Sequence, residues 1–391
     1  MMAEMDRLLR IRDAVVAAVA PLSPEEVATA EAGGRVLAEA ARACRPAPPT
    51  TCSAMDGYAV RAADVRGPCG LPLRGAVYAG DTPGPLEPGT AARIFTGATV
   101  PAGADAVIRS EAAREEGGAV RFLDAARRGE NVREAGEDVA AGGLALAAGG
   151  RIGPRQAALL AAVGVERVRV HRRPRVAILS TGDEVVRGGT PDSNGVALEG
   201  LVAALGAIVS RRAVPDRLEA VRDAVAEALT AADAVVTVGG VSVGERDHVP
   251  AALAALGAEV RVHGVPMKPG KPFLFALAGG KPVLGLPGSP SACLVAFEVF
   301  ARPALLALAG AAVRERPALP LRLAEPAAGR PGRARLLWAR LEPGGRVRPL
   351  GKDSAQIRGP ALADALVLVP ADAGDLAEGA EVTAWLVGEG A

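Results

Sequence analysis

Residues 175–184 have the sequence Arg-Val-Ala-Ile-Leu-Ser-Thr-Gly-Asp-Glu, a continuous apolar run that ends in small and acidic residues. An unbroken apolar run is typical of a strand whose two faces are both buried. More runs follow, and helical segments separate them. The runs are 207–214, 234–238, 260–262, 273–275 and 283–286, and the helical segments are about 195–205, 216–232 and 290–308. Strands that alternate with helices predict a doubly wound, mostly parallel sheet with both faces covered.

The rest of the chain departs from this α/β pattern. Residues 55–137 hold short apolar runs broken by Gly and Pro, and short strands return after residue 316, so both regions are predicted to be β-rich. Helices are expected on both sides of the first β-rich block, one starting at Ser23-Pro24-Glu25-Glu26 and one over 155–163. We therefore predict a multidomain α/β plus β protein with four parts. These are a helical N-terminal domain (1–48 and 139–172), an inserted small β domain (49–138), an α/β domain (173–316) and a C-terminal, barrel-like β domain (317–391).

Composition excludes several classes of protein. Of the 391 residues, 50% are hydrophobic and 23% are charged, which excludes a chain that is mainly disordered. The 45 basic and 44 acidic residues nearly cancel, which argues against a nucleic-acid binder. The four cysteines have no CxxC spacing, the longest apolar stretch is too short for a membrane span, and acidic residues occupy the N-terminal region where a signal peptide needs cations. We expect a soluble, cytoplasmic protein.

The glycine-rich segment Gly239–Gly244 follows one of the predicted strands. Ligands of an open α/β sheet bind beyond the carboxyl ends of its strands, and glycines let backbone N–H groups approach a phosphate closely. The segment fits neither GxGxxG nor GxxxxGK[ST], so NAD-binding and P-loop interpretations fail. The alternative is a tight turn between a strand and a helix.

Three acidic residues, Glu184, Asp216 and Asp247, each follow a different predicted strand. Carboxylates that converge beside a phosphate cradle suit a hard divalent cation such as Mg²⁺. The alternative is that each acid caps the helix that follows it, as Asp216 could do for 217–232.

Lysine occurs only four times, and two of the four lie in Lys268-Pro269-Gly270-Lys271-Pro272. Two ammonium groups on a loop fixed by prolines would form an oxyanion site, whereas the alternative is a solvated turn. The turn 286–291 leads into a helix and is a weaker anion-site candidate. Polar loops around Asp56, Thr96 and Asp138 are interpreted from local chemistry only as turns.

Together these segments resemble a known family, that of the molybdopterin molybdenumtransferases, which includes the bacterial MoeA proteins and the gephyrin E domain. The matching motifs span 53–292 in family order: SAMDGYAV, FTGATVPAGADAVI, ENVREAGED, LSTGDEVV, DSN, GGVSVGERD, KPGKPF and LPGSPSA. The resemblance implies that the α/β domain is of the molybdopterin-binding type. It also implies insertion of molybdate into adenylated molybdopterin, with Mg²⁺-dependent release of AMP.

The resemblance further implies a homodimer with each active site shared between subunits. Asp216 and Asp247 would bind the metal, with Glu184 as a further acid, and Asp56, Thr96 and Asp138 would come from the partner chain. The loop with Ser242 would hold the pterin nucleotide, and Lys268, Lys271, Pro272, Arg335 and Ser354 would line the molybdate pocket. Other substrate-binding positions implied by the motifs are Thr181, Asp183, Ser193, Asn194, Gly239, Gly240, Gly244, Pro287, Pro290 and Ser291.

Some positions depart from the family pattern, and other functions compete. Gly288-Ser289-Pro290 replaces the usual Gly-Asn-Pro turn, and Arg333 is an alternative to Arg335. The competing functions are a pterin adenylyltransferase, a non-catalytic molybdopterin-binding scaffold and, least favoured, a nicotinamide-dependent oxidoreductase. Expected partners are a molybdopterin adenylyltransferase and molybdoenzyme acceptors or chaperones, with no nucleic acid and no membrane. The sequence does not distinguish molybdate from tungstate.

Overall fold

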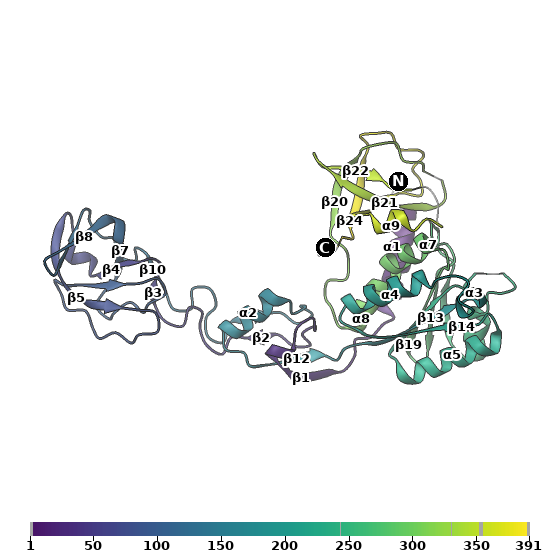
Figure 1. Ribbon diagram of the computed structural model, residues 1–391, viewed down its shortest axis with the longest axis horizontal. Coiled ribbons are helices and arrows are strands. Elements are labelled where there is room, and N and C mark those ends of the chain that lie inside the picture. The colour runs from purple at the N-terminus through teal and green to yellow at the C-terminus, as the bar shows by residue number, and fades with distance from the viewer. Residues whose placement is uncertain (1–2, 243, 330, 352–354, 389–391) are drawn as a thin grey trace.

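The computed structural model describes residues 3–242, 244–329, 331–351 and 355–388, and in the first helix the side chains from Arg7 onward. Figure 1 shows an elongated molecule. A β-rich lobe (residues 49–138, here the β lobe) lies at one end, and the α/β domain and a C-terminal barrel lie at the other (Figure 1). Between them is a narrow connector, residues 24–48 and 139–172.

The α/β domain has a six-stranded sheet with the strand order β14-β13-β15-β19-β18-β16. The first four strands are parallel, whereas β18 and β16 run antiparallel to their neighbours. The strands are β13 (Arg175–Thr181), β14 (Ile208–Val214), β15 (Ala234–Val238), β16 (Glu259–His263), β18 (Leu274–Ala278) and β19 (Lys281–Leu286). The helices are α3 (Asp183–Val186), α4 (Ser193–Ala204), α5 (Leu218–Ala231), α6 (Val249–Ala255), α7 (Pro290–Ala296), the π-helical η4 (Phe297–Ala301) and α8 (Arg302–Leu308). The predicted mostly parallel sheet is confirmed.

Side chains of β13 alternate between two hydrophobic cores. Val176 and Ile178 pack in the core that contains residues of α4, α7, η4 and α8, whereas Ala177 and Leu179 pack with α5 and α6. Both faces of the sheet are therefore buried, as its continuous apolar run predicts. The expectation that the longest apolar stretch is too short for a membrane span is wrong by length and composition, because Pro290–Leu308 is long and apolar enough, with a mean hydropathy of 1.7. In the structure 89% of its apolar window is buried, as in a core helix.

Helix α1 (Ala3–Ala17) does not pack in the connector that follows it along the chain. Its Leu8 and Val15 are buried in the same core as Phe297 and Trp338, and the helix contacts α8, η4 and β21. The backbone N–H of Leu22 also donates to the carbonyl of Leu308 at 2.9 Å. The chain thus begins on the α/β domain and then leaves it.

The connector contains the strands β1 (Pro24–Ala28), β2 (Ala41–Arg42), β11 (Leu144–Leu146) and β12 (Arg167–His171), with the helix α2 (Pro154–Ala162). Strand β1 pairs antiparallel with β12, and β2 pairs with β11. The helix predicted to start at Ser23 is wrong, because residues 24–28 take their hydrogen-bond partners from a strand about 140 residues away. Local capping chemistry is overridden by this tertiary pairing. The helix predicted over 155–163 is confirmed as α2.

The β lobe is built on a six-stranded sheet with the order β7-β4-β6-β5-β9-β8, and β3 pairs with β10 beside it. Its strands are β3 (Cys52–Ser53), β4 (Gly57–Val60), β5 (Cys69–Val77), β6 (Ala91–Ile94), β7 (Ala106–Arg109), β8 (Ala113–Glu116), β9 (Ala119–Phe122) and β10 (Val132–Arg133). Short 3₁₀ turns cover Thr29–Glu31 in the connector and Ala62–Asp64 and Ser110–Ala112 in the lobe. The lobe has two hydrophobic clusters of its own, separate from that of the connector.

The C-terminal strands form a closed barrel. They are β20 (Ala318–Leu323), β21 (Ala334–Glu342), β22 (Arg346–Pro349), β23 (Ala365–Val369) and β24 (Glu381–Leu386). Around the barrel the strand order is β21-β22-β20-β24-β23, and β23 pairs with β21 to close it. The short helix α9 (Arg358–Ala361) lies between β22 and β23. Strand β17 (Met267–Lys268) comes from the α/β domain and pairs with β21, so Lys268 lies opposite Arg335. The predicted barrel-like domain is confirmed.

Candidate active site

The glycine loop after β15 lies directly against the end of β13. Gly239 and Gly240 have φ values of 82° and 65°, a region that favours glycine. A Cβ atom on either residue would come within about 3 Å of Thr181 Oγ1. The Thr181 hydroxyl donates to the carbonyl of Val238 at 3.1 Å. Thr181, Gly239 and Gly240, all predicted to bind substrate, thus form one compact surface at the carboxyl end of the sheet.

The turn after β19 packs against this loop. A Cβ on Gly288 would lie 3.5 Å from Gly239 Cα, and Asn194 Nδ2 donates to the carbonyl of Gly288 at 2.7 Å. Ser193 opens α4, Pro287 is buried, Pro290 is the first residue of α7, and Ser291 is 4% exposed. The predicted positions on α4 and on 286–291 are therefore neighbours of the glycine loop.

Asp192 anchors this region and was missed as a site residue. Its carboxylate caps α4 by accepting the N–H of Gly195 at 2.9 Å, and it also accepts hydrogen bonds from the Ser180 hydroxyl and from Arg211. An Asp immediately before a predicted helix is the N-cap signal that could have found it.

The predicted metal-binding acids occupy two places. Asp183 and Asp216 exchange hydrogen bonds, each carboxylate accepting the backbone N–H of the other at 3.3 Å. Glu184 folds over Gly182, and Asp247 Oδ2 accepts the N–H of Gly244 at 2.8 Å. Among the described residues, no group of three or more His, Cys, Asp or Glu side chains is placed to hold a metal ion.

The helix-capping alternative is wrong for Asp216 and Asp247. The N-caps of α5 and α6 are Arg217 and His248, and neither helix has a side-chain cap. The two carboxylates instead accept backbone N–H groups of loops at the end of the sheet, Asp216 from Asp183 and Asp247 from Gly244. Ser242 belongs to the same loop as Gly244 and is half-buried.

A small cavity joins the α/β domain to the barrel. It brings together Lys268, Ser291 and Arg335, three of the predicted residues, and its remaining lining is Pro269, Leu336, Leu337, Trp338, Leu350, Gly351, Gln356, Gly359 and Pro360. Arg335 Nε is buried without a hydrogen-bond partner, although the guanidinium also donates to the carbonyl of Ala328. Trp338 Nε1 donates to Ser291 Oγ at 3.0 Å.

Other predicted pocket residues lie elsewhere. Lys271 is exposed and Pro272 half-buried, and neither lines the cavity. Ser354 lies outside the described residues. Arg333, the alternative to Arg335, is likewise not in the lining. Trp338 and Gln356 were missed; the rarity of tryptophan, only two in the chain, is a signal that could have drawn attention to Trp338.

The β lobe carries the remaining predicted acids. Asp56 Oδ1 accepts both the hydroxyl of Thr96 at 2.7 Å and its backbone N–H at 2.8 Å. These two hydrogen bonds, with a smaller contribution from the charge of Arg93, hold the pKa of Asp56 below its usual value. Asp138 pairs with Arg133 at 2.9 Å, and the antiparallel pairing of β3 with β10 brings their segment close to the loop of Asp56.

Within one chain, the two groups of predicted residues are far apart. The β lobe, with Asp56, Thr96 and Asp138, lies at the opposite end of the molecule from α3, which begins at Asp183, and from β14, which Asp216 follows in the chain (Figure 1). A single chain therefore does not bring the predicted site residues of the β lobe close to those of the α/β domain.

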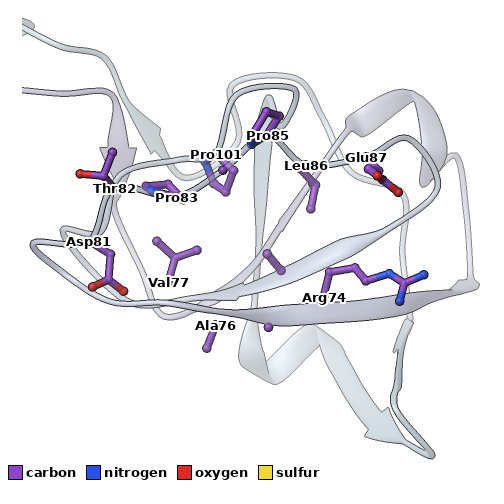
Figure 2. A pocket seen from close by; sticks show the side chains of 13 residues that line it. Arg74, Ala76, Val77, Asp81, Thr82, Pro83, Pro85, Leu86, Glu87 and Pro101 are labelled. Atoms are coloured by element: carbon purple, nitrogen blue, oxygen red, sulfur yellow. The ribbon is translucent and has the colours of Figure 1, made fainter.

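The β lobe also contains an open cavity of its own (Figure 2). The loop with Pro83 and Pro85 forms one side, and strand β5 with Arg74 and Val77 forms the other (Figure 2). Its lining includes Asp81 and Glu87 but none of the predicted site residues.

Comparison with known families matches almost the whole chain. Residues 6–164 match the MoeA N-terminal region (domains I and II), 177–307 match a probable molybdopterin-binding domain, and 320–387 match the MoeA C-terminal region (domain IV). A molybdopterin molybdenumtransferase of Nostoc sp. is 38% identical over 298 residues, covering 72% of this chain and 68% of the relative. Molybdopterin molybdenumtransferase 2 of Mycobacterium tuberculosis is 34% identical and covers 90% and 97%.

This chain belongs to the molybdopterin molybdenumtransferase family. Two solved MoeA structures from Pyrococcus horikoshii are similar over the full length. One has a TM-score of 0.76 at 34% identity, covering 99% of each chain, and the other has 0.82 at 27%, covering 97% and 99%. The resemblance and the transferase class expected from the motifs are confirmed. The matches to both outer MoeA regions also disfavour a stand-alone pterin adenylyltransferase.

Proposed function

We propose that this member of the molybdopterin molybdenumtransferase family inserts molybdate into adenylated molybdopterin and releases AMP. The proposal rests on one observation: the glycine loop at Gly239 adjoins the turn that leads to the cavity lined by Lys268 and Arg335. Gly288 packs on Gly239, and Ser291, three residues further on, lines the cavity with Lys268 and Arg335. A nucleotide on the loop would therefore lie beside a site for an oxyanion.

Lys268 and Arg335 are suited to collect the molybdate dianion. They are cross-strand neighbours on β17 and β21, and the partnerless Nε of Arg335 is a donor that a buried site needs to satisfy. Molybdate attacks an anionic pyrophosphate, so part of the barrier is repulsion between like charges. Cations placed before the reaction lower that repulsion. Because the molybdate oxygen is already nucleophilic, no general base is required.

The glycine loop would receive the pterin nucleotide. The positive φ values of Gly239 and Gly240 and the absence of side chains there leave the backbone open to close approach. Ser242 and Asn194 supply polar groups at its edges, and the amide of Asn194 is already oriented by Gly288. These residues bind and orient the substrate and take no part in bond breaking.

The donor chemistry of Asp216 and Asp247 fits Mg²⁺. Mg²⁺ usually takes one or two carboxylates and completes its shell with water and substrate phosphates, so a cluster of three acids is not required. When bound, Mg²⁺ would neutralise phosphate charge and stabilise the leaving AMP. Asp183 and Glu184 would orient these acids, Asp183 through its exchange of hydrogen bonds with Asp216.

A homodimer would complete the site, because the β lobe, which contains Asp56, Thr96 and Asp138, lies at the opposite end of the chain from the α/β domain with its glycine loop (Figure 1). The β lobe of one subunit would face the α/β domain of the other. Such an enzyme would act in the cytoplasm, receive its substrate from a molybdopterin adenylyltransferase and pass the product to molybdoenzymes or their chaperones.

The test is release of AMP from adenylated molybdopterin, measured with and without molybdate and Mg²⁺. Release that requires both ions supports the proposal. Tight nucleotide binding without release under any condition would instead favour a carrier or scaffold. Mixing an Asp56→Ala chain with an Asp247→Ala chain tests the shared site. Recovery of activity in the mixture is expected, and two variants that stay inactive together contradict sharing.

A further inference from the structure

Tyr78 is unusual in this chain. Only 3% of the residues are aromatic, and among the residues that the structure describes Tyr78 is the one aromatic side chain left exposed, at 56%. Its ring stacks on that of Phe95, with centroids 4.7 Å apart and planes inclined by 10°. One face of the Tyr78 ring is thus covered by Phe95, and much of the remaining ring is open to solvent.

This aromatic pair adjoins the Asp56 site. Phe95 immediately precedes Thr96, whose hydroxyl and N–H both donate to Asp56. The guanidinium of Arg93 lies 5.4 Å from the centre of the Phe95 ring, and its charge also acts on Asp56. Arg93 therefore connects the rings with the carboxylate in one continuous surface.

The backbone holds both rings in position. Tyr78 N–H donates to Asp81 Oδ2 at 2.8 Å, and the N–H of Asp81 donates back to the Tyr78 carbonyl at 3.0 Å. The N–H of Phe95 donates to the carbonyl of Val77 at 3.2 Å. Asp81 also lines the open cavity of the lobe (Figure 2), so the turn that carries Tyr78 adjoins that cavity.

We propose that the Tyr78–Phe95 pair is a stacking platform for a flat heteroaromatic ring of the adenylated pterin, presented by the β lobe of the partner chain. Rings of this kind stack on tyrosine with little dependence on their substituents. Arg93, which also pairs with Glu115 at 3.4 Å, places a guanidinium beside a platform whose ligand carries phosphate. The inference rests on the proposed function, because it takes that substrate and that shared site as given.

The experiment compares Tyr78→Ala with Tyr78→Trp in the full-length protein, and the readout is KM for adenylated molybdopterin against kcat. Stacking of one ring contributes about 1–3 kcal/mol, so KM should rise between about fivefold and a hundredfold in Tyr78→Ala. Tyr78→Trp should keep the wild-type KM, and kcat should change little in either variant. Leu123→Ala, which truncates another exposed apolar residue of the same lobe, is the matched control.

An unchanged KM in Tyr78→Ala would overturn the platform. So would a fall in kcat at constant KM, because Tyr78 would then only support Asp56 and Thr96. Inhibition by AMP identifies which ring stacks on Tyr78. A higher inhibition constant for AMP in Tyr78→Ala indicates adenine, whereas an unchanged inhibition constant with a raised KM indicates the pterin.

If the proposed function is wrong, the experiment gives a result that differs from failure of the platform alone. Wild-type protein would then release no AMP, yet direct titration of wild type and Tyr78→Ala with AMP and with adenylated molybdopterin would still compare ring binding. Weaker binding by the variant supports the platform without the reaction, and equal or absent binding by both overturns it.

Discussion

The indole of Trp338 in the barrel donates its N–H to the hydroxyl oxygen of Ser291 at the start of α7, at 3.0 Å. Both residues are buried, with 7% and 4% exposure, and both line the cavity that holds Lys268 and Arg335. The hydrogen bond crosses the boundary between the α/β domain and the barrel. Because the Ser291 oxygen is used as an acceptor, its own proton is free to point to an anion in the cavity.

Replacing Trp338 by Phe should therefore affect both stability and molybdate binding. The change leaves Ser291 without its buried donor, which costs about 1–3 kcal/mol, and lets the hydroxyl rotate. We expect a lower denaturation midpoint in urea and a raised KM for molybdate. Trp385→Phe is the control, since Trp385 lies in the same barrel away from the cavity. Equal effects of the two changes on KM would contradict the assignment.

Replacing Thr96 by Val should raise the pKa of Asp56 towards its usual value, because the hydroxyl donor is lost while the backbone N–H remains. A carboxyl whose pKa is lowered on folding contributes stability above its unfolded pKa, and this contribution disappears as the pH falls through its folded pKa. In the variant the contribution should be smaller, and its loss should be complete at a higher pH.

The measurement is a carboxyl NMR titration of Asp56, together with the acid limb of the pH–activity profile. Both should move to higher pH in Thr96→Val. Thr50→Val removes a hydroxyl of the same lobe whose hydrogen-bond partner is Thr99, and it should leave the titration unchanged. An Asp56 midpoint equal to that of wild type would show that Thr96 does not set its charge.

Replacing Asp247 by Ala should abolish Mg²⁺-dependent AMP release. The same carboxylate also closes the turn at Gly244, so loss of activity alone does not separate metal binding from turn structure. Asp247→Asn keeps an oxygen acceptor for the Gly244 N–H and removes the charge. It should therefore keep nucleotide binding but need more Mg²⁺ for half-maximal rate, whereas Asp223→Asn, on the exposed side of α5, should behave as wild type. Unchanged Mg²⁺ dependence in Asp247→Asn would remove Asp247 from the metal site.

Glu298 lies in η4 and is 7% exposed. Among the described carboxylates, its neutralisation should lower the free energy of unfolding the most. It accepts two hydrogen bonds from Arg316, at 2.9 and 3.0 Å, and Arg302 lies 4.0 Å away. Breaking a buried ion pair from one side costs about 3–5 kcal/mol, because the other charge stays buried. Glu298→Gln should lower the free energy of unfolding by this amount in a urea titration. The exposed Glu315→Gln should change it by less than about 0.5 kcal/mol, and similar values for both would refute the prediction.

The sequence predicts best where one physical pattern dominates. The apolar run at 176–179 became the buried strand β13, and the helical segments of the α/β domain became α4, α5 and α7–α8. Ser23 shows the limit of such rules, because its cap signal is local and the partner of β1 is β12, distant in sequence. The second lysine of the Lys268 loop shows another limit, since a loop of five residues does not reveal which side chain enters the cavity.

The site was predictable mainly as a set of residues and much less as an arrangement. The motifs identified Thr181, Gly239 and Gly240, which the structure brings into contact. That Asp216 bonds to the backbone of Asp183 and not to α5 depends on the register of two parallel strands, which no local pattern encodes. Tyr78 had no motif at all, and its stacking on Phe95 appears only when β5 and β6 pair.

The position of α1 has a consequence for synthesis of the chain on the ribosome. A free helix of 15 residues is marginal in water, and the core that buries Leu8 and Val15 is built from η4, α8 and Trp338. At roughly 5–20 residues per second, the first helix waits about 15–60 s for its binding surface to be translated. During that interval the connector and the β lobe can already fold from their own clusters. The nascent protein therefore exposes the apolar side chains of this amphipathic helix, Leu8 and Val15 among them, until the barrel emerges, and we expect α1 to be a target for ribosome-associated chaperones.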